Sequence, residues 1–140
     1  MTPGSETPFV LIAKLKVRRD CLDAYLTIAR DADEAVKKSE PGMLLHTLDA
    51  DPTDPCAFTW TEIYENDAAL IAHFNNPRLK PYLEAHEKYG EGEITVAIHG
   101  NLADETIDFL NSSGVPWSHH IPQFGFASPF QSRDLSEPKS

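Results

Sequence analysis

Four stretches of the chain alternate between apolar and polar positions with the period of two that is typical of β-strands. They cover residues 9–17, 43–49, 57–64 and 93–99. The first stretch is apolar on both sides over half of its length, with Val10 and Ile12 on the side opposite Leu11. A strand with this pattern is covered on both faces, so the alternation predicts a sheet that is packed on two sides.

A helical spacing of apolar side chains predicts a long helix over residues 21–38, with Asp20 as its N-cap. The helix is expected to end at Glu40-Pro41-Gly42, because proline cannot continue a helix and glycine tolerates positive φ. The predicted apolar stripe consists of Leu22, Leu26, Ala29 and Val36.

A second helical region follows the third strand and is interrupted at Asn75-Asn76-Pro77. Asn66 is the expected N-cap of the first piece, and Asp67 adds favourable charge to its first turn. The apolar stripes of the two pieces consist of Leu70, Ile71 and Phe74, and of Leu79, Tyr82, Leu83 and His86.

The resulting order of strand, helix, strand, strand, helix and strand predicts an α+β, ferredoxin-like split βαβ fold over residues 8–100. Its sheet should have four antiparallel strands with helices on one face. The helices leave Val10 and Ile12 without cover. A twofold partner sheet is the simplest cover, so we expect a homodimer.

Residues 101–140 form a C-terminal extension of different character. A short helix is expected at 102–110, followed by an extended arm to about residue 130. The arm contains Trp117, Phe124, Phe126 and Phe130, and we expect it to cover apolar surface on the protomer or its partner. The first seven residues and the last ten are expected to be loose.

The charge balance is acidic, with 22 Asp and Glu against 12 Lys and Arg and a net charge of -10. This charge repels phosphate backbones and anionic membranes, so neither nucleic acid nor a membrane is an expected partner. The first eight residues do not resemble a secretory signal, and the two cysteines have no CxxC spacing. We therefore expect a cytoplasmic protein with free thiols.

The third strand and the helices after it carry most of the candidate chemistry. Glu62 stands between Trp60 and Tyr64 on one face, and His73 flanks the apolar stripe of the first helical piece. A carboxylate and an imidazole in such positions can move protons, but each can also be a structural side chain with a satisfied hydrogen bond. His46 and His99 are possible cross-strand neighbours, and we expect no metal site. The chain contains no nucleotide-binding or nucleophile motif.

Four motifs occur in order along the chain: Glu40-Pro41-Gly42, the Asp-Pro turn, Glu62-Ile63-Tyr64-Glu65-Asn66 and the helix Ala68-Ala69-Leu70-Ile71-Ala72-His73. Together they resemble the antibiotic biosynthesis monooxygenase (ABM) domain. The chain departs from that pattern at Thr61, where many members have Tyr, and at Tyr64, where Trp is usual. The resemblance implies a dimeric α/β barrel with a small-molecule cavity between the sheet and the helices of each protomer.

The resemblance also implies an activity. Some ABM domains oxidise anthrone- or quinol-type aromatics with O₂ and without metal or flavin, so we expect no cofactor, with O₂ as co-substrate. The expected substrate is an aromatic or enolisable small molecule. Haem-degrading members carry an Asn in the first strand, which this chain lacks, and His73 and Tyr82 occupy their Trp and His positions. Haem degradation is therefore disfavoured.

Two hypotheses follow. In the first, the protein is a small monooxygenase-like enzyme in which His73 is the base and Glu62 orients it or carries a second proton. Trp60, Tyr64, Tyr82 and His86 would then contact the substrate. In the second, the protein is a non-catalytic dimeric domain that binds a hydrophobic small molecule or is only structural.

Overall fold

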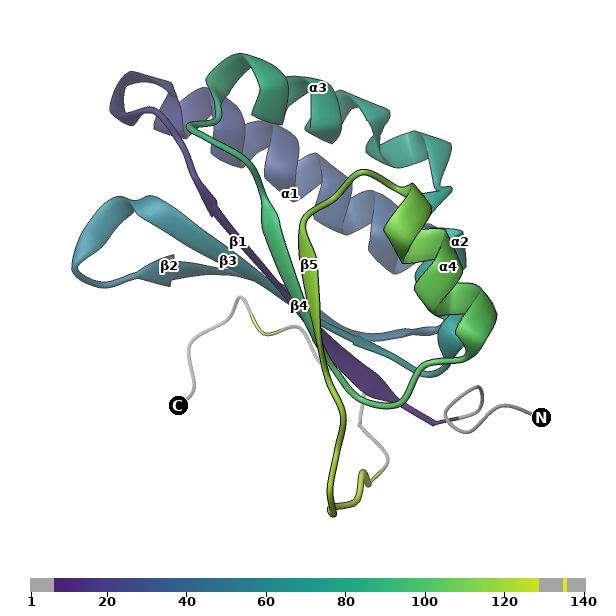
Figure 1. The fold of residues 1–140 in the computed structure, drawn as a ribbon. Helices are drawn as coiled ribbons and strands as arrows, with labels where there is room; N and C mark the ends of the chain where they lie inside the picture. Colours follow the sequence, from purple (N-terminus) through teal and green to yellow (C-terminus); the bar gives the residue numbers. More distant parts are fainter. Residues whose placement is uncertain (1–6, 129–134, 136–140) are drawn as a thin grey trace.

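The chain forms one mixed sheet with all of its α-helices on one side, in a computed structural model that describes residues 7–128 and 135 (Figure 1). The five strands, in the spatial order β2-β3-β1-β4-β5, are β1 (Phe9–Lys16), β2 (Met43–Asp51), β3 (Asp54–Tyr64), β4 (Thr95–His99) and β5 (Trp117–His120). The predicted ferredoxin-like split βαβ order is confirmed. The prediction of four antiparallel strands is wrong, because β5 adds a fifth strand that runs parallel to β4.

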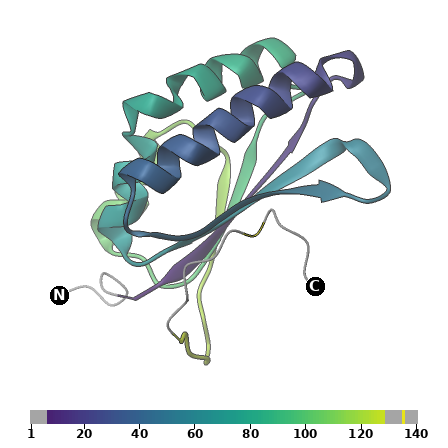
Figure 2. The same cartoon turned by 180° about the vertical axis from the view of Figure 1, so that it is seen from behind.

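The helices form a layer that covers one face of this sheet, as the view from behind also shows (Figure 2). They are α1 (Leu22–Ser39), α2 (Asp67–Phe74), α3 (Lys80–Tyr89) and α4 (Asp104–Ser112), with single 3₁₀ turns at Arg19–Cys21 and Pro77–Leu79. In the described part of the chain, no helix is long and apolar enough to cross a membrane.

Helix α1 buries Tyr25, Ala29, Ala32 and Val36, which recur at the helical spacing. Two details of the prediction are wrong. Leu26 is 38% exposed and does not belong to the buried stripe. Asp20 does not cap α1, because a 3₁₀ turn precedes the helix and moves its N-cap to Cys21, which makes no side-chain capping bond.

The cap predicted for α2 is confirmed, since the side chain of Asn66 accepts a hydrogen bond of 3.0 Å from the backbone N–H of Ala69. Asp67 does more than add charge to the first turn. Its carboxylate is buried and accepts hydrogen bonds from the backbone N–H of Ala103 at 2.7 Å and from the hydroxyl of Thr106 at 2.6 Å. These bonds join the start of α4 to α2.

Two glycines allow close contacts that no other residue permits. A Cβ on Gly42 would lie 2.7 Å from the Cβ of Ala69, so glycine is needed there for space and not for the positive φ that we expected. Gly100 does have a positive φ of 152°, and a Cβ there would lie 2.2 Å from the Cβ of Phe9. Gly42 directly precedes β2 and lies against Ala69 of α2, and Gly100 directly follows β4 and lies against Phe9 of β1. Each glycine therefore lets the end of a strand approach a neighbouring element closely.

The two faces of the sheet differ in their surroundings. Leu11, Leu15, Phe58 and Ile98 are buried under the helices. The opposite face, which we call the open face, carries the half-buried side chains of Val10, Ile12, Leu45, Ile63 and Ala97. None of the described helices covers it (Figures 1 and 2). The homodimer that would bury this face stays a prediction.

The C-terminal extension packs only in part. The helix predicted at 102–110 is present as α4, and its Leu110 joins the same core as Leu11. Trp117 lies in β5, is half-buried and donates a hydrogen bond of 3.0 Å to the side chain of Asn111. Phe124 and Phe126 are 95% exposed, so they do not cover their own protomer as expected. Phe130 lies outside the described residues.

Candidate functional site

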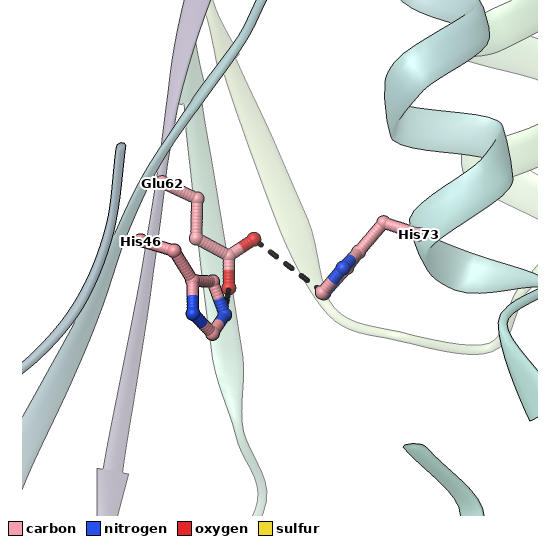
Figure 3. Close-up of side chains that lie close together, drawn as sticks. All are labelled: His46, Glu62 and His73. Carbon is pink, nitrogen blue, oxygen red and sulfur yellow. Dashed lines mark ion pairs between the residues drawn. The ribbon is translucent and has the colours of Figure 1, made fainter. Parts of the chain in front are cut away.

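Three side chains from three elements meet between the sheet and α2: His46 of β2, Glu62 of β3 and His73 of α2 (Figure 3). The two oxygens of Glu62 face different imidazoles. Oε2 lies 3.7 Å from Nε2 of His46, and Oε1 lies 3.8 Å from Nε2 of His73. Glu62 is buried and the two histidines are nearly so, with side-chain exposed fractions of 10% for His46, 6% for Glu62 and 12% for His73. We call these three residues the histidine–glutamate cluster.

Strand register places the first two members side by side. His46 pairs directly with Glu62, and a register shift between Met43 and Leu45 sets this alignment. Because side chains alternate between the faces of a strand, both residues point toward the helices. His73 lies in the last turn of α2. Its ring centroid is 5.8 Å from that of His46.

Each imidazole of the cluster also binds a carboxylate on its far side. Nδ1 of His46 lies 2.8 Å from Oδ1 of Asp33, and Nδ1 of His73 lies 2.9 and 3.0 Å from the two oxygens of Glu40. A carboxylate accepts hydrogen bonds, so each Nδ1 carries the proton and donates it. In the neutral imidazoles, both Nε2 lone pairs then face Glu62.

Glu40 is buried at 8% exposure, although it follows directly after α1. Burial by itself would raise its pKa, but hydrogen bonds from His73 and from Asn76 outweigh burial and lower that pKa. Burial would likewise lower the pKa of His73, but the hydrogen bond with Glu40 and the charges of Glu62 and Glu40 raise it. The two shifts stabilise a His73–Glu40 ion pair.

Tyr64 supports the central carboxylate. Its hydroxyl donates a hydrogen bond to Oε1 of Glu62, and its ring stacks on Phe9 with the centroids 5.5 Å apart. Burial, and next the charge of Glu62, raise the pKa of Tyr64, so the phenol stays a donor. Because the side chain is fully buried, Tyr64 packs in the core beside the cluster rather than forming an exposed wall.

Trp60 links the cluster to a pair of tyrosines. Its ring stacks on His46 with the centroids 4.6 Å apart, and its Nε1–H donates a hydrogen bond of 2.8 Å to the hydroxyl of Tyr82. The hydroxyl of Tyr82 also bonds that of Tyr25 on α1. Burial raises the pKa of both tyrosines, which therefore remain neutral.

His86 is not brought into the cluster. Its Nε2 lies 3.1 Å from the carbonyl oxygen of Gly92, and its ring contacts Tyr25 edge-on. Leu83, which we placed on the same buried face, is 55% exposed. The expected pairing of His46 with His99 is wrong, because β2 and β4 are separated by β3 and β1, and His99 pairs with His120 of β5.

Sequence reasoning placed Glu62, His73, Trp60, Tyr64, Tyr82 and His86 around one space, of which the structure leaves His86 outside the cluster, and it missed His46, Asp33 and Glu40. A signal for His46 was present, since it alternates onto the helix-facing side of a strand that neighbours Glu62 in the sheet. Nothing local marked Asp33 or Glu40, because both lie on or just after a long amphipathic helix. Together the side chains can accept or hold protons, and the three inner atoms can also hold a cation.

Comparison with solved structures supports the same architecture. The chain is similar to an antibiotic biosynthesis monooxygenase candidate from Bacteroides thetaiotaomicron, at 26% identity and a TM-score of 0.58 over 65% of this chain and 88% of that one. A Caulobacter crescentus structure with the same description matches at 22% identity and a TM-score of 0.64, over 68% and 90% of the two chains. A Nitrosomonas europaea structure matches at 20% identity and a TM-score of 0.64, over 74% of this chain and 97% of that one.

Sequence comparisons agree with the structural ones. An uncharacterised protein of Synechocystis sp. is 28% identical over 81 residues, which are 58% of this chain and 54% of that relative. The chain thus spans about half the length of this curated relative. The sequence model of the family described as antibiotic biosynthesis monooxygenase matches residues 8–87, more than half of the chain and all members of the histidine–glutamate cluster. The chain belongs to the antibiotic biosynthesis monooxygenase family.

Proposed function

We propose that the protein is a small oxygenase that acts on a hydroxylated aromatic or enolisable small molecule, with O₂ as the only co-substrate. For an anthrone-type substrate, a CH₂ group next to the conjugated system becomes a carbonyl group. The carbon loses two hydrogens and gains one oxygen atom, while the second oxygen atom leaves as water. The substrate supplies all four electrons, so the reaction balances without an added reductant.

The histidine–glutamate cluster carries this proposal. In its neutral form His73 is the proposed base, because Glu40 holds its Nδ1–H and leaves the lone pair of Nε2 facing the interior, and the raised pKa of His73 strengthens it as a proton acceptor. Glu62 lies beside that atom and beside Nε2 of His46, which makes it the second proton carrier. We expected Glu62 to orient His73, but the hydrogen bond that holds this imidazole is the one with Glu40. Trp60 and Tyr82 remain the proposed substrate contacts, and Tyr64 acts through Glu62.

The protein's part in such a reaction is limited. Triplet O₂ reacts slowly with closed-shell molecules but accepts an electron from an enolate or phenolate. His73 would take the proton that forms this anion, and the anion would pass one electron to O₂. Recombination forms the carbon–oxygen bond of a peroxide anion, which takes the proton back from His73, and the resulting hydroperoxide loses water to form the carbonyl group. Positioning the substrate and excluding bulk water are the remaining tasks, and the burial of the cluster serves the second of them.

We further propose that two copies pair through their open faces. Val10, Ile12 and Ile63 offer apolar side chains there that the helices do not cover. The proposed setting is the cytoplasm, in which the two cysteines, both free thiols in the structure, stay reduced.

Oxygen uptake by the full chain, measured with a panel of hydroquinones and anthrones as substrates, tests the activity. The protein is first freed of metal by a chelator. We expect uptake that is lost in His73→Gln, whose amide can still donate to Glu40 but cannot serve as a base. Glu62→Gln tests the second carrier, and His99→Gln on the open face is the matched control. Uptake no faster than in buffer, or equal in wild type and His73→Gln, would contradict the proposal.

A non-catalytic ligand-binding or structural domain is the second candidate. The close packing of the aromatic side chains favours it, because Tyr64 is fully buried and the hydroxyl of Tyr82 is engaged by Trp60 and Tyr25. Mass spectrometry of small molecules that co-purify with the protein separates the two. A bound aromatic molecule that is returned unchanged in the presence of O₂ supports this second candidate.

A further inference from the structure

We propose that the histidine–glutamate cluster is a binding site for one divalent transition-metal ion, held by Nε2 of His46, Nε2 of His73 and the carboxylate of Glu62. The inference does not rest on the proposed oxygenation, and it departs from our expectation that the chain has no metal site.

The spacing of the three donor atoms is the first argument. All three lie within 4.8 Å of one another, and the two nitrogens are 3.7 and 3.8 Å from the oxygens of Glu62. Both distances are longer than a hydrogen bond. Donors that share one tetrahedral metal ion at a bond length of about 2.1 Å stand roughly 3.4 Å apart. The gaps are therefore close to those that a bound ion sets, and small side-chain movements would close them.

The surroundings of the two imidazoles are the second argument. Ligating histidines usually donate their other ring N–H to a carboxylate, which fixes the ring and makes the ligating nitrogen more basic. Both histidines of the cluster have this contact, His46 with Asp33 and His73 with Glu40. The hydroxyl of Tyr64 orients Glu62 in the same way. Each of the three donors thus has its own supporting hydrogen bond.

Charge is the third argument. The carboxylates of Glu40 and Glu62 are nearly buried and that of Asp33 is 42% exposed, and these three acidic groups surround two imidazoles. Among the described residues, no lysine or arginine forms an ion pair with any of them; the ion pair found for such a side chain joins Lys16 to Asp54. A divalent ion would offset this negative charge.

The donor set decides the class of ion. Two imidazoles and one carboxylate suit Zn²⁺, Co²⁺ or Fe²⁺, whereas Mg²⁺ and Ca²⁺ prefer oxygen ligands. Three protein donors leave at least one coordination position free. Because a bound ion would occupy Nε2 of His73, metal-loaded protein should not support the cofactor-independent reaction proposed above.

Calorimetric titration of the metal-free full chain with Zn²⁺, and separately with Mg²⁺, tests the site. We expect one Zn²⁺ per chain and no comparable binding of Mg²⁺. Glu62→Gln and His46→Gln should weaken Zn²⁺ binding about a hundredfold or more, and the positioning variant Glu40→Gln about tenfold to a hundredfold. His99→Gln and His120→Gln, a histidine pair on the open face, are the matched controls and should bind as wild type does.

The visible spectrum of bound Co²⁺ provides a second readout that does not depend on activity. Wild type should show intense bands typical of low-coordinate Co²⁺, and these should vanish in Glu62→Gln. If a variant fails to fold, X-ray absorption of the wild-type Zn²⁺ complex decides by counting imidazole ligands, with two expected. Absence of Zn²⁺ binding to wild type, unchanged binding in Glu62→Gln, or loss of binding in the controls would overturn the inference.

The metal site and the proposed oxygenation can be disproved independently of each other. Oxygen uptake by metal-free protein without any Zn²⁺ binding would remove the metal site alone. Tight Zn²⁺ binding by a protein that consumes no O₂ with the substrate panel would remove the proposed oxygenation alone.

Discussion

Two histidine pairs occupy opposite faces of the same sheet. On the helix-covered face, His46 and His73 are nearly buried, each bound to a carboxylate and both directed at Glu62. On the open face, His99 and His120 are exposed and stack on each other, with their ring centroids 4.4 Å apart and their planes inclined by 11°. Within the described chain, neither of these two forms an ion pair with a carboxylate.

The contrast shows that residue type and strand position do not by themselves make a reactive histidine. Nε2 of the exposed His120 lies 3.0 Å from the hydroxyl of Ser118, which can either donate or accept, so this contact does not fix the tautomer of the imidazole. A buried one must satisfy its nitrogens with protein groups, and the choice of those groups decides which atom is available for chemistry. Only the helix-covered face provides carboxylates on both sides of its imidazoles.

The largest expected effect is on turnover, when a histidine of the helix-covered face is replaced. His73→Gln should lower turnover about a hundredfold or more, the usual contribution of a positioned general base. His99→Gln should leave turnover unchanged. Initial rates of O₂ uptake measure both. We use Gln rather than Ala because Ala would leave the buried carboxylate of Glu40 without His73 and so lower stability as well. Equal rates in the two variants would remove the distinction between the faces.

The next effect concerns the assembly on the open face. Ile12→Glu places a charge in the proposed interface, where it would lose its hydration, and should raise the dissociation constant of the dimer about a hundredfold or more. Leu83→Glu makes the same change on the helix side, where the residue is 55% exposed, and should leave the dimer intact. Sedimentation velocity measures both. A wild-type protein that is monomeric at micromolar concentration would contradict the proposed dimer.

A smaller effect is expected from the hydrogen bond that supports Glu62. Tyr64→Phe removes the buried hydroxyl that donates to its carboxylate and should lower the free energy of unfolding by about 2 kcal/mol. Urea denaturation followed by circular dichroism gives this value. Tyr89→Phe, the same substitution at a tyrosine that is only partly buried, should lower the free energy of unfolding clearly less. An unchanged unfolding midpoint in Tyr64→Phe would show that the hydroxyl does not support the cluster.

The smallest effect on the protomer is expected from the arm. Truncation after Pro122 removes Phe124 and Phe126, which are exposed, and should change the free energy of unfolding by less than about 0.5 kcal/mol. It should loosen the dimer if the arm contacts the partner. Truncation after Leu110 also removes β5 and should destabilise the protomer itself. Equal stability losses in the two truncations would show that the distal arm packs after all.

Much of the fold could be predicted from local patterns. The alternation in β1 and β3, the helical spacing in α1 and the cap at Asn66 depend on neighbouring residues in the sequence, and all three are present in the structure. The fifth strand escaped prediction, because Trp117 to His120 has no pattern of its own and becomes a strand by pairing with β4. The same holds for Asp67, whose hydrogen bonds reach residues on α4 that are distant in sequence.

The sequence by itself determined the order of elements, the family motifs and the face on which Glu62 and His73 lie. Tertiary structure decided which of the six histidines meet a carboxylate. Glu40 and His73 are separated by 33 positions, and Asp33 and His46 by 13. Contacts across such separations depend on how α1, α2 and the edge strand β2 are placed in space. Burial then strengthens the contacts that form, because water no longer competes for the same hydrogen bonds.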